Sequence, residues 1–257
     1  MRSWGRITLA LVLIFLIGPF AIILAAGLSD GETLAFPPQG ISLRWVLAVF
    51  ELESFRASFA LSLVLATAST MAALVLGTPV AYALDRYRPP GAIAISALLT
   101  SPLVVPGIIV GLALLRHFVI PLGVGVTTAL FLAHTALLIP YAARVVSASL
   151  ANLRVDIEEA AILLGASRPG AFFRVVLPNI RSGVLAAFIL GFITSFNQVP
   201  VSLFLSGPGV STLPIDMLSY MEFTYDPSIA ALSAMLALMS VAIVLVAERL
   251  LGLSRYV

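Results

Sequence analysis

The chain of 257 residues contains no cysteine and no lysine, and only 10% of its residues are charged. Without cysteine, neither disulfides nor thiolate metal sites can form. A phosphate-binding loop of the GxxxxGK(S/T) kind is excluded because that loop needs a lysine. No nucleophile-and-base pair, metal-ligand cluster or acid pair is apparent either. We therefore expect no catalytic residue, cofactor or metal site in this chain.

Apolar residues dominate what is present. They make up 61% of the sequence, and the mean hydropathy is +1.12, whereas a soluble domain is roughly 25% charged. Six runs lack Asp, Glu and Arg, at residues 7–28, 57–84, 91–115, 118–143, 182–215 and 227–247. Each reaches the roughly 20 residues that a helix needs to cross a bilayer, and none alternates as a barrel strand does. The composition indicates an integral membrane protein.

We predict an all-α fold of six transmembrane helices in a single domain that covers residues 1–257. The expected spans are about 7–28, 57–84, 92–115, 124–146, 183–205 and 228–250. The fifth ends early in its run because Gly-Pro-Gly at 207–209 breaks a helix. A cleaved signal peptide is the alternative for the first run, but 22 residues exceed the usual 7 to 15 of its apolar core.

The arginines predict the orientation. With the N-terminus inside, eleven of the 14 basic residues lie in cytoplasmic segments, and three, Arg44, Arg56 and Arg116, lie outside. This positive-inside bias places both termini in the cytoplasm. The pI near 9.3 then reflects membrane topology, and we expect no nucleic-acid partner.

Two connecting segments have helical patterns. Outside, STLPIDMLSYMEF at residues 211–223 predicts a short amphipathic helix, with an irregular connection as the alternative. Inside, Asp156 and Glu159 have the spacing of a capping box, which predicts a helix over about 157–164. Gly165 can end this helix in the left-handed conformation, and Ser167 before Arg168-Pro169 is typical of a second helix start.

Polarity predicts how the inner helix is oriented. We expect Ala160, Ala161, Leu163 and Leu164 to contact the membrane domain, and Glu158, Glu159, Arg168 and Arg174 to face away. The alternative is a solvated amphipathic loop helix with no partner.

This inner segment resembles the signature of the membrane subunits of binding-protein-dependent ABC importers. The signature is EAA, three residues, Gly, nine residues, an aliphatic residue, one residue and LP. Here it is Glu159, Ala160, Ala161, Gly165, Val175, Leu177 and Pro178, with valine where isoleucine is usual. The resemblance implies that residues 152–178 form the coupling helix region, which sits in a cleft of a cytoplasmic ATPase. It also implies that Glu159 pairs with a basic residue of the ATPase, beside Glu158, and that Gly165 allows the bend.

The resemblance extends over residues 41–251, through ALDRYR, SPLVVPGIIVG, AHTALLIPY and SFNQVPVSLFLSGPGVSTLP. These stretches are similar to the second permease of the spermidine/putrescine-type branch. The implied partners are a second, different permease, two ATP-binding subunits that hold ATP and magnesium, and an external solute-binding protein. The implied location is the bacterial inner membrane.

Four polar residues at membrane depth are candidates for the translocation path: His134, Ser195, Asn197 and Gln198. Intramembrane polar groups often mark a path, but they also bind helices to one another, and both interpretations stay open. Polyamine permeases often have two acidic residues where this chain has Asn197 and Gln198. Neutral amides do not offset charge, so this departure favours a solute that is less cationic than a polyamine, or an anion. We expect a small amine, polyamine-like or amino-acid-like solute, with an anionic or phosphonate-type solute as the alternative.

The sequence thus predicts the membrane subunit of an ATP-driven importer. The remote alternative, an ion-driven secondary transporter, usually places Asp or Glu at membrane depth, and the six runs contain neither. A membrane enzyme or scaffold has still less support.

Overall fold

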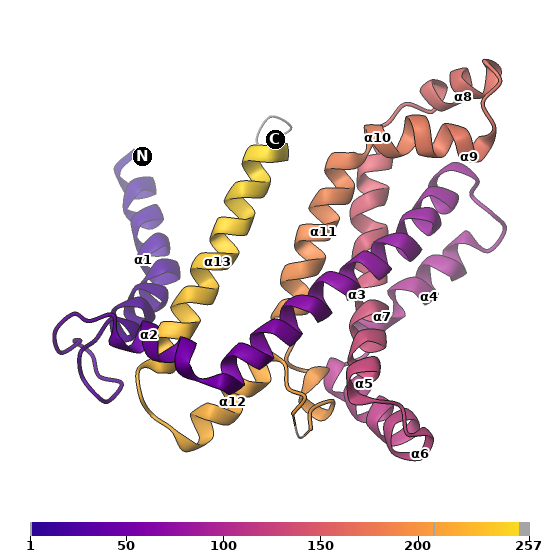
Figure 1. Cartoon of the computed structure of the whole chain (residues 1–257). Coiled ribbons are helices and arrows are strands. Elements are labelled where there is room, and N and C mark those ends of the chain that lie inside the picture. The colour runs from indigo at the N-terminus through magenta and orange to yellow at the C-terminus, as the bar shows by residue number, and fades with distance from the viewer. Residues whose placement is uncertain (1, 208, 252–257) are drawn as a thin grey trace. The chain divides into compact units, whose positions relative to one another are not determined.

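The computed structural model describes residues 2–207 and 209–251, and the elements assigned to them are helical (Figure 1). The chain divides into two compact units. The first unit contains the segments up to Ser58 and Asp216–Leu245, and the second contains Phe59–Ile215 and the residues from Val246 onward. The expectation of a single domain stays a prediction.

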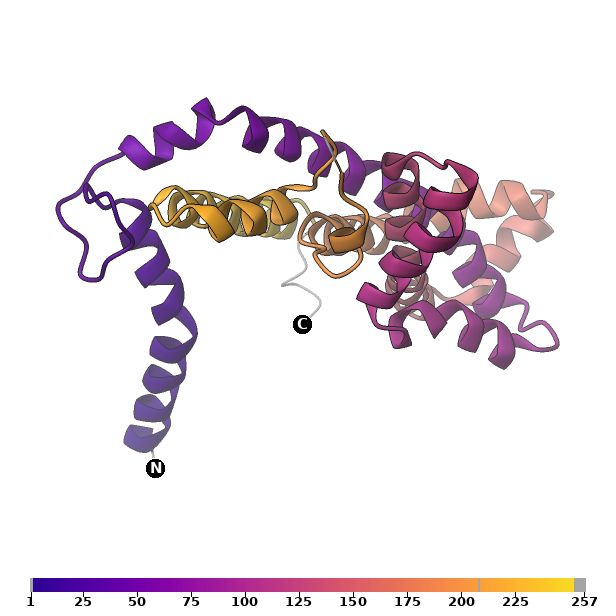
Figure 2. The same ribbon diagram turned by 90° about the horizontal axis from the view of Figure 1, so that it is seen from below.

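The first unit contains α1 (Arg2–Gly27), α2 (Arg44–Glu51), the start of α3 (Glu53–Arg86), most of α12 (Leu213–Phe223) and most of α13 (Ser228–Leu251). A Cβ on Gly27 would lie 2.6 Å from the backbone nitrogen of Ala231, so α1 and α13 touch backbone to backbone there. Away from this contact the two helices diverge (Figure 2). The apolar stretch of α1 buries nothing within the chain, which suits a helix that faces lipid.

Asp226 organises the end of α12 and the start of α13. It accepts hydrogen bonds from the Tyr220 hydroxyl at 2.7 Å and from the Ser228 backbone at 2.9 Å. Nearby, the Ser58 hydroxyl donates to Asp216 at 3.1 Å. The helix predicted at 211–223 is confirmed as α12, which begins at Leu213.

The second unit is built on α3, α7 (Val126–Ala151) and α11 (Arg181–Phe196). Apolar side chains of α3, α7 and α11, with Val176 and Ile180, form one buried cluster, which includes Tyr82, Leu138 and Val146. Leu65, Leu130, Val201 and Leu205 belong to a second. The remaining elements are α4 (Ala92–Val104), α5 (Gly107–Leu114), the π-helical turn η1 (Leu115–Val119), α6 (Ile120–Leu122) and the 3₁₀ turn η3 (Ser202–Phe204).

Between α7 and α11 lie α8 (Val155–Leu163), α9 (Arg168–Ala171), the π-helical turn η2 (Phe172–Val176) and α10 (Leu177–Asn179). Figure 1 shows this group beyond the ends of α7 and α11. The predicted inner segment is therefore a separate helical layer at one end of the second unit.

Four described helices are long and apolar enough to span a membrane, and two bent pairs raise this number to as many as six. The predicted third span, 92–115, is wrong as a continuous helix, because α4 and the helix that begins at Gly107 meet at 89°. Val105, which precedes Pro106, is extended with ψ 127°, as expected for a residue whose helical conformation clashes with the following proline ring.

The predicted fifth span, 183–205, is also too long. Helix α11 ends at Phe196, and Asn197 leaves the helical conformation with ψ 14°. Pro200 lies three residues further on and disfavours a helical Val199. The 16 residues of α11 extend about 24 Å, so the chain continues at membrane depth as irregular backbone and η3.

Candidate functional site

Helix α8 begins without the predicted capping box. Its N-cap is Arg154, and no side chain caps the helix. The Arg154 guanidinium donates instead to both carboxylate oxygens of Asp156, at 3.1 and 2.5 Å. These bonds hold the pKa of the Asp156 carboxyl below its usual value. The capping box fails because α8 begins at Val155, which places Asp156 in the first turn of the helix and not at the N-cap.

Glu158 is buried, at 5% exposure, which contradicts the expectation that it faces away. Its Oε1 accepts a hydrogen bond from the Tyr82 hydroxyl. Its Oε2 lies 3.3 Å from Arg86 Nε, as an ion pair without hydrogen-bond alignment. Arg86 also donates to Asp85 at 2.9 Å and to the carbonyl of Leu153 at 3.0 Å. A buried carboxylate needs such partners, since an unpaired buried charge is costly.

The opposite face of α8 is open. Glu159 and Ala160 are exposed, and Leu163 and Leu164 are 87% and 90% exposed. The expectation that Ala160, Leu163 and Leu164 contact the membrane domain is therefore wrong. Residues 158 and 162 share one helix face, and 159 and 163 share the next. Once Glu158 is bound inward, the helical repeat turns Glu159 and Leu163 outward.

Gly165 and Ser167 behave as predicted. Gly165 has φ +96°, and a Cβ there would meet nothing within 4 Å, so its backbone conformation, not space, favours glycine. The Ser167 hydroxyl accepts a hydrogen bond from the Gly170 backbone at 3.2 Å and caps α9.

The remaining signature positions lie further along the segment. Ala161 is half-buried in α8, and Leu177 is half-buried against the main apolar cluster. Pro178 is exposed in the first turn of α10. Fixed φ and a missing N–H suit proline at that position.

A solvent-open cavity of about 390 Å³ lies beside α8 and the end of α3. Arg86, Tyr87, Glu158, Glu159 and Arg168 contribute its charged and aromatic lining. The Arg168 guanidinium carbon lies 5.5 Å from the centre of the Tyr87 ring, within range of a cation–π contact. This open cavity borders α8 beside the buried contacts of Glu158.

His134 joins α7 to the chain on both sides of the α11 terminus. Its Nδ1 lies 2.7 Å from Ser195 Oγ, and its Nε2 lies 3.1 Å from Ser202 Oγ. The ring is 1% exposed. The Ser202 hydroxyl also donates a hydrogen bond to the Gln198 carbonyl at 2.9 Å. This carbonyl lies beyond the end of α11, where Pro200 and the end of the helix leave carbonyls without a helical partner.

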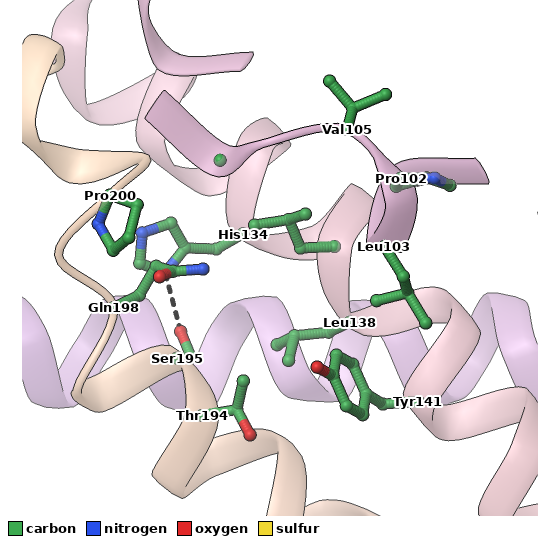
Figure 3. Close-up of a pocket in the computed structure, with 12 residues that line it drawn as sticks. Pro102, Leu103, Val105, His134, Leu138, Tyr141, Thr194, Ser195, Gln198 and Pro200 are labelled. Carbon is green, nitrogen blue, oxygen red and sulfur yellow. Dashed lines mark hydrogen bonds between the residues drawn. The ribbon is translucent and has the colours of Figure 1, made fainter. Parts of the chain in front are cut away.

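A second cavity, of about 170 Å³, lies beside this cluster (Figure 3). Its polar lining includes His134, Ser195, Gln198, Tyr141 and Thr194, and Pro102 of α4 and Pro200, beyond the end of α11, also line it. Asn197 is not among the lining residues. It is exposed, and its amide donates to the Ile193 carbonyl at 3.0 Å. Three of the four predicted path residues therefore meet at one cavity, and Asn197 lies apart.

Three residues of these sites were not singled out from the sequence. Tyr82 and Arg86 lie at the end of a predicted span, and ALDRYR contains Arg86. Ser202 lies within the stretch that also holds Ser195 and Gln198. Among residues 2–207 and 209–251, no group of three or more His, Asp or Glu residues could hold a metal ion.

Comparisons with known proteins agree with this architecture. Residues 73–254 match the family described as "Binding-protein-dependent transport system inner membrane component". The putrescine transport system permease protein PotI of Escherichia coli K12 is 34% identical over 91% of this chain and 85% of its own length. The molybdenum transport system permease protein ModB of Mycobacterium bovis is 31% identical over 82% of this chain and 87% of its own.

A solved structure has the same fold. It is titled "Crystal structure of a bacterial ABC transporter involved in the import of the acidic polysaccharide alginate". It superposes with a TM-score of 0.68, covering 98% of this chain and 96% of that one, at 17% identity. At that identity the likeness shows the fold alone.

Proposed function

This chain belongs to the family of inner-membrane components of binding-protein-dependent transport systems, and from that premise we propose how its two sites work. It is a multi-pass inner-membrane permease, and the identity to PotI confirms its resemblance to the polyamine branch. We propose that a cytoplasmic ATPase binds this permease through α8. The observation that carries this proposal is the exposed face of Glu159, Leu163 and Leu164 on a helix anchored through Glu158.

The proposed complex contains this subunit, a different second permease, two ATP-binding subunits and an external solute-binding protein. ATP and magnesium would bind in the ATP-binding subunits, and hydrolysis would take place there. Closure of those subunits would push α8 of this chain and its counterpart together and open the path outward. Both termini would lie in the cytoplasm, as the eleven inner arginines suggest.

We propose that the smaller cavity is this chain's contribution to the translocation path. Its imidazole, hydroxyl and amide groups can exchange hydrogen bonds with a polar solute without holding it tightly, as a transport path requires. We place Asn197 only at the edge of the proposed path, because its side-chain amide caps the C-terminus of α11.

A small amine-type solute is the substrate class that we favour, because PotI carries "putrescine" in its name and is 34% identical. An anionic solute is the second candidate, because ModB, a molybdenum permease by name, is 31% identical. The lining of the cavity supplies no carboxylate to a cation. Calorimetry of the cognate external binding protein with polyamines, amino acids and phosphonates separates the two candidates. We expect an amine to bind, and binding of a phosphonate alone would contradict that assignment.

Glu159→Arg in the reconstituted complex tests the grip on the ATPase. The exposed carboxylate would be replaced by a like charge facing the basic residue expected in the ATPase, and like charges at an interface are strongly unfavourable. We expect the ATP-binding subunits to dissociate and solute-stimulated hydrolysis to be lost. Asp156→Asn, on the same exposed helix, is the matched control. Unchanged assembly and unchanged stimulation in Glu159→Arg would show that this grip is wrong.

A further inference from the structure

We propose that Glu158, Arg86 and Tyr82 form the joint through which movement of α8 reaches α3. They are positioning residues: they touch neither solute nor nucleotide, and they fix one helix to another. The inference rests on the proposed function, because it assumes that a partner moves α8. The inference goes beyond the proposed function because it names the residues that transmit the movement of α8 to the membrane helix α3.

The geometry joins two helices through one carboxylate. The two partners of Glu158, the Tyr82 hydroxyl and the Arg86 guanidinium, lie one helical turn apart on the last part of α3, so they share a face. Each engages a different oxygen of Glu158. One hydrogen bond and one ion pair thus hold the two oxygens of the Glu158 carboxylate against α3, and they restrain how far α8 can rotate or slide.

Arg86 also binds a third segment, the connection between α7 and α8. Its guanidinium also donates to the carbonyl of Leu153, which lies between the end of α7 and the start of α8. The planar fork of arginine can serve several acceptors at once, whereas lysine is a point charge on a flexible stem. The side chain of Arg86 thus connects α3, to which it belongs, with the α7–α8 connection and with α8.

The cavity beside the joint explains why these bonds carry the movement. A tightly packed α8 would transmit motion through all its side chains, since packed interiors resist deformation. Here a solvent-open cavity of about 390 Å³ borders α8 and the end of α3. On this side of α8, the polar contacts of Glu158 therefore connect the helix to α3 where side-chain packing does not.

The charges favour this role over simple stabilisation. Asp85 and Glu158 share the single guanidinium of Arg86, so the cluster carries one surplus negative charge. A buried pair is weak evidence for stability, because desolvation offsets much of the attraction. Asp85 binds the Arg86 guanidinium from within α3 and so keeps it oriented toward Glu158 when α8 moves.

The test uses the complete complex, reconstituted in lipid with the solute-binding protein and ATP. Three variants change the polar contacts of the joint but keep side chains of similar size, so that the chain can still fold: Glu158→Gln, Arg86→Lys and Tyr82→Phe. The last keeps the ring contacts of Tyr82 with Phe172 at 4.8 Å and with Tyr87 at 5.7 Å. Asp156→Asn is the control, since Asp156 has an exposed ion pair on the same helix. The measurements are assembly, basal hydrolysis and the ratio of stimulated to basal hydrolysis.

We expect Glu158→Gln to assemble and to lose at least about fivefold of the stimulation ratio, the lower range of allosteric coupling. Tyr82→Phe and Glu158→Gln should be non-additive because they act on one connection, whereas Tyr82→Phe and Asp156→Asn should add. A wild-type ratio in Glu158→Gln would overturn the joint. So would loss of assembly in all three variants, which would make the cluster a folding element only.

The failure of this inference is distinguishable from failure of the proposed function. A wild-type complex without solute-stimulated hydrolysis contradicts the proposed function itself. Stimulation in the wild type that persists in Glu158→Gln contradicts only the joint. Glu159→Arg should release the ATP-binding subunits, whereas Glu158→Gln should keep them bound and uncoupled.

Discussion

Nε2 of His134 in α7 lies 3.1 Å from Oγ of Ser202 in η3, while Nδ1 of the same ring lies 2.7 Å from Ser195 in α11. One imidazole thus bridges three elements around the point where α11 ends. Because both ring nitrogens are bonded and the ring is buried, His134 has a packing role even as it borders the cavity.

His134→Ala should lower the stability of the solubilised complex. The change removes two hydrogen bonds, and polar contacts between membrane helices average about 0.6 kcal/mol each, so we expect about 1 kcal/mol from the bonds and more from the cavity left behind. Thermal unfolding of the complex measures the loss. Asn197→Ala is the control, since its exposed amide bonds only a nearby carbonyl. Equal melting temperatures for the two variants would contradict the bridging role.

Gly165→Val should impair coupling more than Gly165→Asn. At φ +96° a β-branched residue is strained by about 1–2 kcal/mol or more, while asparagine tolerates positive φ. No neighbour lies within 4 Å of an added Cβ, so the Cβ of either residue meets no clash in this chain. Solute-stimulated ATP hydrolysis is the readout, and Gly5→Ala, also in open space, is the control. If Val and Asn behave alike, the backbone conformation of Gly165 does not matter for coupling.

Gly111→Val should destabilise the second unit. A Cβ on Gly111 would overlap the backbone carbonyl oxygen of Val201, and backbone cannot move aside as a flexible side chain can. Overpacking of this kind costs about 1–3 kcal/mol. We expect a lower melting temperature and a lower yield of assembled complex than for Gly18→Ala, where nothing lies within 4 Å. Wild-type stability in Gly111→Val would show that α5 and Val201 are not in backbone contact.

The orientation can be tested without first removing native thiols, because the chain has no cysteine. Arg154→Cys and Glu222→Cys each place a thiol at an exposed position. In spheroplasts, a membrane-impermeant maleimide should label the chain with Glu222→Cys directly. It should label the chain with Arg154→Cys only after permeabilisation. The reverse pattern would place the termini outside.

Much of this architecture is predictable from local sequence patterns. Apolar runs indicated the helices, and Gly165 and Ser167 marked a bend and a cap because their roles depend on their own backbone. The inward face of α8 was not predictable, since Glu158 and Glu159 are adjacent and equally charged. Its choice of face depends on Tyr82, 76 residues earlier, and no local pattern reports so distant a partner. Likewise the bridge to Ser202 depends on a chain reversal at Pro200.

Solute uptake by proteoliposomes tests the central claim most directly. Vesicles would contain the full complex with ATP inside, or this chain alone with a proton or sodium gradient, and labelled solute would be added with its binding protein. The importer assignment predicts uptake only when the ATP-binding subunits and ATP are present, and no uptake by the chain alone. Uptake by the chain alone under an ion gradient, without ATP, would contradict it.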